Sequence, residues 1–383
     1  MPAPPEFSHE ELIRYSRHLS LPQVGVAGQA RLKHARVLIV GAGGLGSPAA
    51  LYLTAAGVGT IGLVDFDVVD GSNLQRQVLH GTGAIGVSKL QSARARLADL
   101  NPHVRLETFD ARLTAANGLD VLRGWDVVLD GSDNFPTRYL VNDACVFLGI
   151  PNVYGAVLRF DGQVSVFDAK RGPCYRCLYR EPPPPELVPS CAEGGVMGVV
   201  PGVIGSLQAL EAIKLVTGAG TPLIARLLLF DGLKLQFREI ELSRDPDCVV
   251  CGPHPTVKRL IDYEAFCGVG GGGRAKGEGV EISAIELRAE RDRKPSLHLL
   301  DVRELFEWEI ARIDGARLIP LGELPARVRE LDGHAAIVTY CHHGVRSRHA
   351  AEILRASGFS SVRSLTGGID AWSTDVDPGI PRY

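Results

Sequence analysis

A glycine-rich turn near the start of the chain has the composition of a phosphate-binding loop. Gly41-Ala42-Gly43-Gly44-Leu45-Gly46 follows an apolar, strand-like run over 36–40, and Asp65 closes the next such run. Glycines let the backbone approach phosphates, while the N-terminus of the following helix offers unpaired N–H groups to an anion. An acidic residue at this distance can accept hydrogen bonds from ribose hydroxyls. The pattern predicts a nucleotide site, and by itself it fits nicotinamide or flavin as well as ATP.

Three polar residues downstream have the chemistry that a polyphosphate requires. Arg76 lies on a loop and Lys89 in the first turn of a predicted helix, and each can neutralise phosphate charge. Asp133, in Asp130-Gly131-Ser132-Asp133-Asn134, follows a strand end, where open parallel sheets bind ligands, and its carboxylate can hold Mg²⁺. A single lysine or arginine is usually only a solvated side chain, so the prediction depends on the whole set.

Two Cys-x-x-Cys pairs, Cys174/Cys177 and Cys248/Cys251, are separated by 70 residues. Each pair brings two thiolates to one side of a tight turn, and two such turns complete a tetrahedral Zn²⁺ site. Four thiolates leave no open coordination position, so we expect one structural zinc ion per subunit. A redox dithiol is the alternative, but a redox motif would not need a second copy.

A further cysteine, Cys341, follows an apolar run over 336–340 and opens the loop Cys341-His342-His343-Gly344-Val345-Arg346-Ser347 before a predicted helix. Its thiol would face backbone N–H groups and a positive helix end, which lower a thiol pKa and stabilise anionic sulfur. We therefore expect Cys341 to be a nucleophile. His342 and His343 could suggest a metal, but adjacent side chains point apart and no third ligand is evident, so we expect none there.

The elements that must position these residues alternate along the first part of the chain. Strand signals fall at 36–40, 60–65, 104–109 and 126–130, and helix signals at 45–56, 88–100 and 136–148. This alternation predicts a parallel sheet covered by helices on both faces. Further expected elements are a helix from the capping box Ser8-His9-Glu10-Glu11 to about 19, a hairpin of 157–160 and 163–167 with its turn at Asp161-Gly162, and a helix over 203–216.

Two stretches of unusual composition divide the chain. Four consecutive prolines, 182–185, begin an irregular segment that extends to about Gly202. Gly268–Gly279 contains seven glycines in twelve residues, a composition typical of a flexible interdomain linker. Beyond it the alternation resumes, with strands at 297–302 and 336–340 and a helix at 346–357. We therefore predict an α/β protein with a domain at 1–267, a linker at 268–280 and a second domain at 281–383.

Composition weighs against several classes of function. The 383 residues carry a net charge of −3, which provides no general attraction to nucleic acids or membrane surfaces. No signal peptide is apparent and no apolar run reaches 18 residues, so we expect no membrane-spanning helix. Eight cysteines, four of them in Cys-x-x-Cys pairs, fit metal or thiol chemistry in a reducing compartment, so we expect the cytoplasm. Cys145 and Cys267 have no evident partners, and we expect ordinary buried or linker cysteines.

The motifs within residues 8–260 together resemble the MoeB/ThiF family of ubiquitin-activating-like adenylyltransferases. The matching segments are R-Y-S-R at 14–17, G-A-G-G-L-G at 41–46, D-F-D at 65–67, S-N-L-Q-R-Q at 72–77, K at 89 and D-G-S-D-N at 130–134. The resemblance implies a Rossmann-like doubly wound sheet, zinc at the four paired cysteines and a homodimer in which the residue matching Arg14 reaches the phosphates of the neighbouring subunit. It implies that ATP and Mg²⁺ contact residues of these motifs, with Arg76 and Asp133 taking part in catalysis: Arg14, Gly44, Asp65, Ser72, Asn73, Arg76, Lys89, Asp133 and Asn134.

Residues 281–383 resemble the rhodanese sulfurtransferases. The Cys341 loop, Leu300-Asp301-Val302-Arg303-Glu304 and the segment from Leu365 to Trp372 carry this resemblance. It implies a persulfide on Cys341, loaded by a donor such as a cysteine desulfurase or thiosulfate, although His342 stands where many relatives carry Arg or Lys. In fused family members, the position of Cys191 is the proposed thioester or acyl-disulfide cysteine. Some relatives work without a covalent step there, so its role stays open.

The two halves together predict an activator of a ubiquitin-fold sulfur-carrier protein ending in Gly-Gly. The carrier's terminal carboxylate would be adenylated by ATP and then receive sulfur from Cys341, giving a thiocarboxylate for molybdopterin, thiamine, cysteine or thiolated-tRNA pathways. Three alternatives stay open. A nicotinamide oxidoreductase would leave Arg76, Lys89 and Asp133 unused, and a binding scaffold with decayed catalysis would usually have lost some of these residues. An activator for conjugation of ubiquitin-like proteins would share the activation chemistry.

Overall fold

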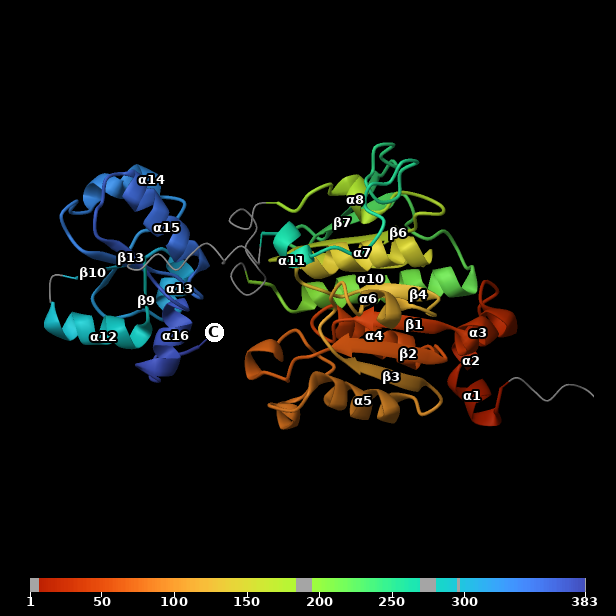
Figure 1. Cartoon of the computed structure of the whole chain (residues 1–383). Helices are drawn as coiled ribbons and strands as arrows, with labels where there is room; N and C mark the ends of the chain where they lie inside the picture. The colour runs from red at the N-terminus through yellow and green to blue at the C-terminus, as the bar shows by residue number, and fades with distance from the viewer. Residues whose placement is uncertain (1–6, 184–194, 269–279, 295–296, 383) are drawn as a thin grey trace, which may run out of the picture. The chain divides into compact units, whose positions relative to one another are not determined.

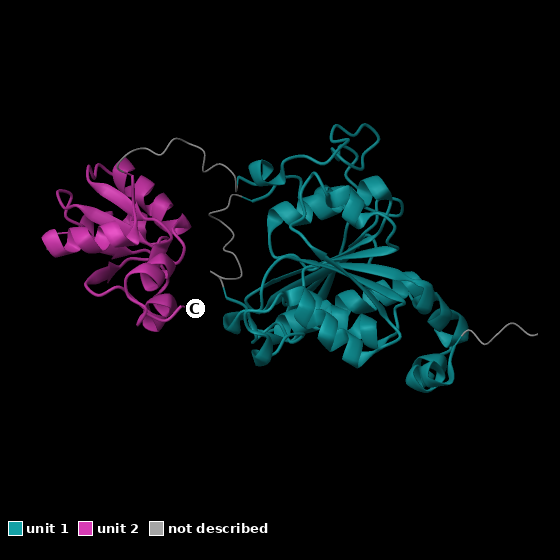
Figure 2. Ribbon diagram, turned by 60° about the horizontal axis from the view of Figure 1, so that its bottom comes forward, with its two compact units in different colours: residues 1–270 teal, residues 271–383 magenta. Residues whose placement is uncertain are grey.

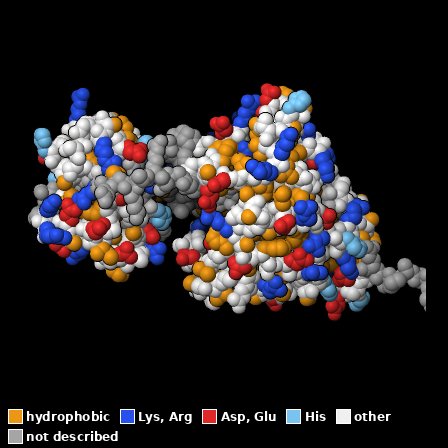
Figure 3. Space-filling model, viewed as in Figure 1, with side chains coloured by type: hydrophobic (Ala, Val, Ile, Leu, Met, Phe, Trp, Pro, Cys, Tyr) orange, Lys and Arg blue, Asp and Glu red, His pale blue; other side chains and the backbone are white. Residues whose placement is uncertain are grey.

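The computed structural model describes residues 7–183, 195–268, 280–294 and 297–382. The chain divides into two compact units, residues 1–270 and 271–383 (Figure 2), and each has its own sheet. Acidic and basic side chains are interspersed on the face drawn in Figure 3.

An eight-stranded sheet forms the centre of the first unit, in the order β3-β2-β1-β4-β5-β6-β7-β8. The part of this order from β3 through β2 and β1 to β4 is labelled in Figure 1. The strands from β3 to β5 in this order run parallel, and those from β5 to β8 pair antiparallel. The strands are β1 (Arg36–Val40), β2 (Thr60–Asp65), β3 (Arg105–Asp110), β4 (Val127–Asp130), β5 (Asn152–Leu158), β6 (Asp161–Phe167), β7 (Arg226–Asp231) and β8 (Gln236–Glu241).

Side-chain alternation in β1 explains why helices cover both faces of this sheet (Figure 2). Val37 and Ile39 pack into one hydrophobic core, while Leu38 and Val40 pack into the other. A strand with both faces buried reads as a continuous apolar run, which is the pattern over 36–40. The helices are α1 (His9–Arg14), α2 (Ser16–Leu19), α3 (Gly25–His34), α4 (Gly46–Ala55), α5 (Lys89–Leu100), α6 (Gly118–Leu122), α7 (Phe135–Leu148), α8 (Tyr175–Leu178), α10 (Val199–Thr217) and α11 (Tyr263–Phe266).

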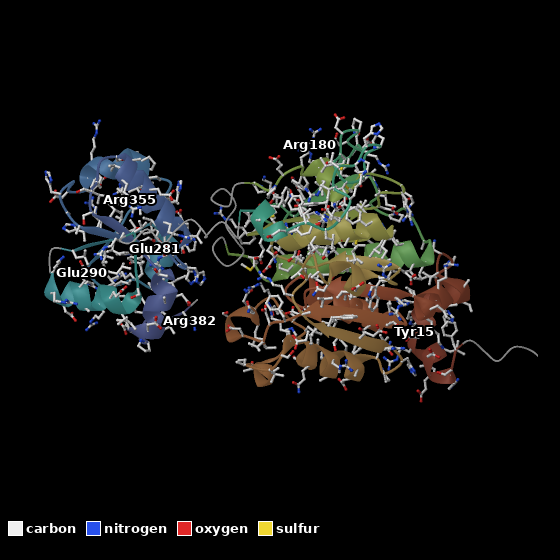
Figure 4. The ribbon with its side chains drawn as sticks, in the orientation of Figure 1. Tyr15, Arg180, Glu281, Glu290, Arg355 and Arg382 are labelled. Carbon is white, nitrogen blue, oxygen red and sulfur yellow. The ribbon has the colours of Figure 1, made fainter. Side chains whose placement is uncertain are left out.

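The N-terminal helix is shorter than predicted. The capping box at Ser8 is confirmed, but α1 ends at Arg14 and α2 begins at Ser16. Tyr15 between them is buried, and its hydroxyl accepts a hydrogen bond from Asn101 at 2.9 Å (Tyr15 is labelled in Figure 4). The chain therefore bends at Tyr15, and the bend buries its ring.

The predicted position of the hairpin turn is wrong. Leu158 pairs with Asp161 across β5 and β6, so Arg159 and Phe160 form the turn, with Arg159 at a φ of 55°. Gly162 lies inside β6 instead, where a Cβ atom would come within 2.4 Å of the side chain of Ile204 on α10. The glycine therefore permits close helix packing and does not form the turn.

Helix α10 has 19 residues, and an 18-residue stretch of it has a mean hydropathy of 1.5, values that by length and composition would also suit a membrane span. It packs against α4, β5 and β6. The buried amide of Gln208 on α10 donates hydrogen bonds to the carbonyls of Asp130 at 2.7 Å and Val153 at 3.0 Å. These contacts are those of a core helix in the first unit.

The second unit contains a five-stranded parallel sheet in the order β11-β10-β12-β13-β9. The fully buried Asp301 and Arg303 form an ion pair at the end of β10, and Arg303 donates to the carbonyl of Ala311 at 2.8 Å. Asp301 therefore organises this unit. Its elements are β9 (Glu281–Ile282), α12 (Ala284–Arg293), β10 (His298–Asp301), α13 (Leu305–Ile310), β11 (Ala316–Leu318), α14 (Leu324–Arg327), β12 (Ile337–Tyr340), α15 (Val345–Ala356), β13 (Val362–Leu365) and α16 (Gly368–Asp375).

Candidate functional site

A pocket in the first unit lies at the carboxyl ends of β1, β2 and β4, where parallel sheets bind ligands. Six of the predicted nucleotide-binding residues line it: Gly44, Asp65, Arg76, Lys89, Asp133 and Asn134. The structure thus brings together residues from five different segments of the sequence. Their roles toward a nucleotide stay predictions.

The glycine loop between β1 and α4 has a conformation that only glycines allow. Gly41 has a φ of +92°, and a Cβ atom on Gly46 would lie 1.8 Å from the carbonyl oxygen of Gly41. The curl places the loop backbone at the pocket and the N-terminus of α4 behind it. This is the geometry with which backbone N–H groups bind phosphate.

The backbone N–H and the backbone carbonyl of Ala42 are each held by a buried side chain. Its N–H donates to Asp65 Oδ2 at 2.7 Å, and its carbonyl accepts from His80 Nε2 at 3.0 Å. Asp65 Oδ1 also accepts the N–H groups of Phe66 and Asp67, each at 2.9 Å. Asp65 therefore anchors the loop in addition to lining the pocket, a role that sequence reasoning missed.

The surroundings of His80 favour its neutral imidazole. Because the Ala42 carbonyl can only accept, Nε2 carries a proton, and Nδ1 lies 3.0 Å from Ser92 Oγ. Burial lowers the pKa of His80 below 6.5, and the positive charge of Lys89 lowers it further. Sequence reasoning did not single out His80, which lies 38 residues from the peptide that it supports.

The predicted cations Arg76 and Lys89 are joined at the pocket by two further charged residues, Asp67 and Arg138. Lys89 is almost fully buried, and its ammonium group lies 2.8 Å from Asp67, which is half-exposed and also lines the pocket. The Arg76 guanidinium donates to Asn73 Oδ1 at 2.6 Å. Arg138 on α7 lines the pocket as well. Asp67 is part of the D-F-D motif, and Arg138 lies one helical turn after Asn134. Their positions in the sequence could therefore have identified both as residues of the pocket.

Asp133 and Asn134 lie between β4 and α7. Strand β4 pairs with β1 on the side away from β2, so these two residues face Asp65 from across the glycine loop. Asn134 caps the helix by accepting the Thr137 N–H at 3.0 Å, and its amide lies 3.4 Å from Asp133 Oδ1. The Asp133 side chain is exposed at the pocket rim. Its carboxylate is the type of oxygen ligand that Mg²⁺ binds beside phosphates, so the donor set fits a metal–nucleotide complex.

Three predicted nucleotide residues do not line this pocket. Ser72 is held by Asp70, which accepts its hydroxyl at 2.6 Å, and Asn73 supports Arg76 as described above. Arg14 is exposed at the end of α1 and donates to the Leu100 carbonyl at 2.9 Å. Cys191 lies outside the described residues.

The four paired cysteines come together as predicted from their spacing. Their sulfur atoms all lie within 4.8 Å of one another, with separations of 3.6 Å between Cys174 and Cys248 and 3.4 Å between Cys177 and Cys251. Tetrahedral Zn–S bonds of 2.3 Å require sulfur atoms about 3.8 Å apart. The cluster therefore fits a zinc ion. Cys145 and Cys267 are buried elsewhere, and burial raises the pKa of both thiols.

Cys341 is fully buried where β12 ends, and its sulfur accepts the Gly344 N–H at 3.1 Å. Gly344 has a φ of +95°, which allows the loop to curl around the sulfur before α15 begins. The first turn of α16 supports the same loop, because the Ile369 N–H donates to the Cys341 carbonyl at 2.9 Å. A curled loop of this kind suits an extra, anionic sulfur atom on the cysteine.

The reasoning that His342 and His343 point apart is wrong. Their rings stack, with centroids 4.0 Å apart and planes inclined by 15°. A third metal-binding side chain, Asp370, lies beside them. Burial, followed by the neighbouring His343, lowers the pKa of His342 to about 4. Arg346 in the same loop forms a two-pronged ion pair with the buried Glu307, at 2.7 and 2.8 Å.

The first unit is a doubly wound α/β fold with a pocket at the carboxyl ends of its parallel strands, and the second is a smaller α/β fold with a buried cysteine on a curled loop. Residues 15–250 match the ThiF family, and residues 283–375 match the rhodanese-like domain. The chain therefore belongs to the ThiF family, in the group that carries a C-terminal rhodanese-like domain.

Relatives of the same two-part organisation match almost the whole chain. A probable adenylyltransferase/sulfurtransferase MoeZ of Mycobacterium tuberculosis is 49% identical, with 98% of this chain and 96% of that protein covered. The adenylyltransferase and sulfurtransferase MOCS3 of Mus musculus is 44% identical over 100% of this chain and 91% of its own length. Among solved structures, Escherichia coli MccB with ATP shares the fold with a TM-score of 0.56 at 23% identity, covering 62% of this chain and 73% of that one.

Proposed function

We propose that this protein adenylates the C-terminal glycine of a ubiquitin-fold sulfur-carrier protein and then converts it to a thiocarboxylate. The observation that carries the proposal is the joining, in one chain, of a pocket lined by a glycine loop, Arg76 and Lys89 with a buried cysteine on a curled loop. Relatives named adenylyltransferase and sulfurtransferase match this chain along nearly its full length, which supports the same two activities here.

The first step makes the carrier carboxylate reactive. A carboxylate oxygen attacks the α-phosphorus of ATP, a mixed anhydride with AMP forms, and pyrophosphate leaves. Arg76 and Lys89 neutralise the polyphosphate, the Asp65-anchored glycine loop supplies N–H donors, and Asp133 holds Mg²⁺, which when bound screens the phosphate charge. Ser72, Asn73 and Asn134 support these groups.

The second step transfers sulfur. The terminal sulfur of a persulfide on Cys341 attacks the acyl carbon, AMP leaves, and an acyl disulfide joins the carrier to Cys341. A second thiol, from Cys191 or a soluble thiol, then attacks Cys341 Sγ and frees the thiocarboxylate. The resulting disulfide is reduced by a further thiol. A cysteine desulfurase or thiosulfate reloads Cys341.

The remaining parts of the proposal concern organisation. We place the adenylation domain at 1–267, the linker at 268–280 and the sulfurtransferase domain at 281–383. Arg14 lies outside its own pocket, which supports a homodimer in which it reaches the neighbouring subunit's nucleotide. The four-cysteine cluster holds structural zinc, and we place the protein in the cytoplasm.

Two variants test this proposal. Cys341→Ala keeps carrier-dependent ATP–pyrophosphate exchange but forms no thiocarboxylate, as measured by the mass of the carrier. Asp133→Ala loses exchange while its thermal unfolding stays cooperative. Cys145→Ala, which removes a buried thiol that does not line the pocket and belongs to a different unit from Cys341, serves as the control. Normal thiocarboxylate output from Cys341→Ala would refute the sulfur-transfer step, and binding of NAD in place of ATP would refute the adenylation step.

A further inference from the structure

Three side chains beside Cys341 form a cluster with metal-ligand chemistry. His342, His343 and Asp370 each offer one ligand atom, and these atoms all lie within 4.8 Å of one another. Nitrogen ligands on a zinc ion, at 2.0–2.1 Å, lie about 3.3 Å from each other. A contraction of at most about 1.5 Å would therefore close the site. His343 is exposed, so its side chain has room to make this movement.

A main-chain contact holds two of the three ligand residues, His342 and Asp370, close together. The Asp370 N–H donates to the His342 carbonyl at 3.2 Å, so the first turn of α16 is bonded directly to the Cys341 loop. This contact needs a glycine, because a Cβ atom on Gly368 would lie 2.3 Å from the carbonyl oxygens of both Cys341 and His342. The cluster is thus set by backbone geometry, although its members are 28 positions apart in the sequence.

The carboxylate of Asp370 retains capacity for a cation. Arg382 approaches both of its oxygens, at 2.7 and 3.1 Å (Figure 4 labels Arg382). A carboxylate has about four lone-pair directions, so two hydrogen bonds from one guanidinium leave others for a metal. Imidazole nitrogens with one carboxylate favour borderline divalent cations such as Zn²⁺ over Mg²⁺ or Ca²⁺.

We propose that His342, His343 and Asp370 form a second zinc site, distinct from the four-cysteine cluster, that controls sulfur loading of Cys341. Three protein ligands leave an open coordination position, unlike the closed four-thiolate site. His342 and His343 are the second and third residues of the loop whose Gly344 N–H contacts the Cys341 sulfur. An ion bound by both histidines fixes this loop, which must move before a sulfur donor can reach the fully buried Cys341. Bound zinc therefore slows loading, a consequence that rests on the proposed function.

Zinc content tests the site directly. The full-length protein, with its four-cysteine site filled, is dialysed against buffered Zn²⁺, and bound metal is measured by mass spectrometry. We expect two zinc ions per chain in the wild type and one in His343→Ala and Asp370→Asn. His349→Ala, which removes a surface histidine on α15 of the same unit, keeps two. One ion in the wild type, or two in every variant alike, would overturn the proposal.

Cobalt and a loading assay give two independent checks. Co²⁺ bound as the second ion should lack the sulfur-to-metal charge-transfer absorption of the thiolate site, and the presence of that absorption would contradict nitrogen and oxygen ligation. Persulfide formation on Cys341, followed by alkylation and mass measurement, should slow several-fold with added Zn²⁺ in the wild type but not in His343→Ala. Loading that is equally fast with bound zinc would refute the control of loading. Loading that fails without zinc would count against the proposed function instead.

Discussion

Replacing Asp65 by Asn tests whether this carboxylate holds the phosphate loop. Its two oxygens accept three backbone N–H groups, from Ala42 at 2.7 Å and from Phe66 and Asp67 at 2.9 Å. Asn has a single carbonyl oxygen, so in either orientation its NH₂ group faces at least one of these donors. At least one hydrogen bond to a charged acceptor is lost, which costs roughly 1.5–3 kcal/mol.

This energy sets the expected loss of activity. Since each 1.4 kcal/mol corresponds to about a tenfold change, kcat/KM for ATP in carrier-dependent pyrophosphate exchange should fall by roughly 10- to 100-fold. The measurement is the initial exchange rate against ATP concentration, with a thermal melt to show that the variant is folded.

Asp110→Asn provides the matched control. Asp110 ends the neighbouring strand β3 in register with Asp65 but is exposed and does not line the pocket. We expect its kcat/KM to equal that of the wild type. An Asp65→Asn enzyme with wild-type kcat/KM, or a loss of the same size in Asp110→Asn, would refute the reasoning.

Two other perturbations have defined outcomes. Because burial lowers the pKa of folded His80 below its unfolded value near 6.5, the stability that it contributes is present above about pH 6.5 and is lost as the pH falls. The melting temperature of the wild type should therefore fall more steeply with decreasing pH, below about pH 6.5, than that of His80→Gln. The Gln amide can still donate to the Ala42 carbonyl but does not titrate. An equally steep fall in both proteins would contradict this role of His80. If the four-cysteine cluster holds the proposed zinc ion, Cys177→Ser should contain less zinc than the wild type and unfold at a lower temperature, whereas Cys145→Ala should keep the wild-type zinc content. A Cys177→Ser protein with unchanged metal content and melting temperature would refute the assignment.

The elements that the sequence predicted well are those whose pattern is local. The strands at 36–40 and 60–65 are observed with these bounds because each is a short apolar run between helix and turn signals. Strand β8 was not predicted, since five of its six residues are exposed and only pairing with β7 holds it at the sheet edge. The hairpin turn was misplaced because Gly162 serves the packing of α10, a contact that local turn preferences do not reveal.

In the candidate sites too, local sequence patterns were predictable and contacts between distant segments were not. The glycine loop, Asp65 and the cysteine pairs carry chemistry in their spacing, and the structure places each set together. The support that His80 gives to Ala42 depends on a tertiary contact between distant segments. The approach of Asp370 to His342 depends on how α16 starts against the Cys341 loop. Neither contact has a signal in a single sequence.

The release of pyrophosphate tests the central claim most directly. Purified protein is mixed with ATP, Mg²⁺ and a ubiquitin-fold carrier ending in Gly-Gly, and pyrophosphate is measured together with the mass of the carrier. The account predicts stoichiometric pyrophosphate and a carrier heavier by one adenylate when Cys341 carries no persulfide. A carrier truncated before its Gly-Gly end should release none. Absence of pyrophosphate with every Gly-Gly carrier tried, while ATP binds the pocket, would contradict the account.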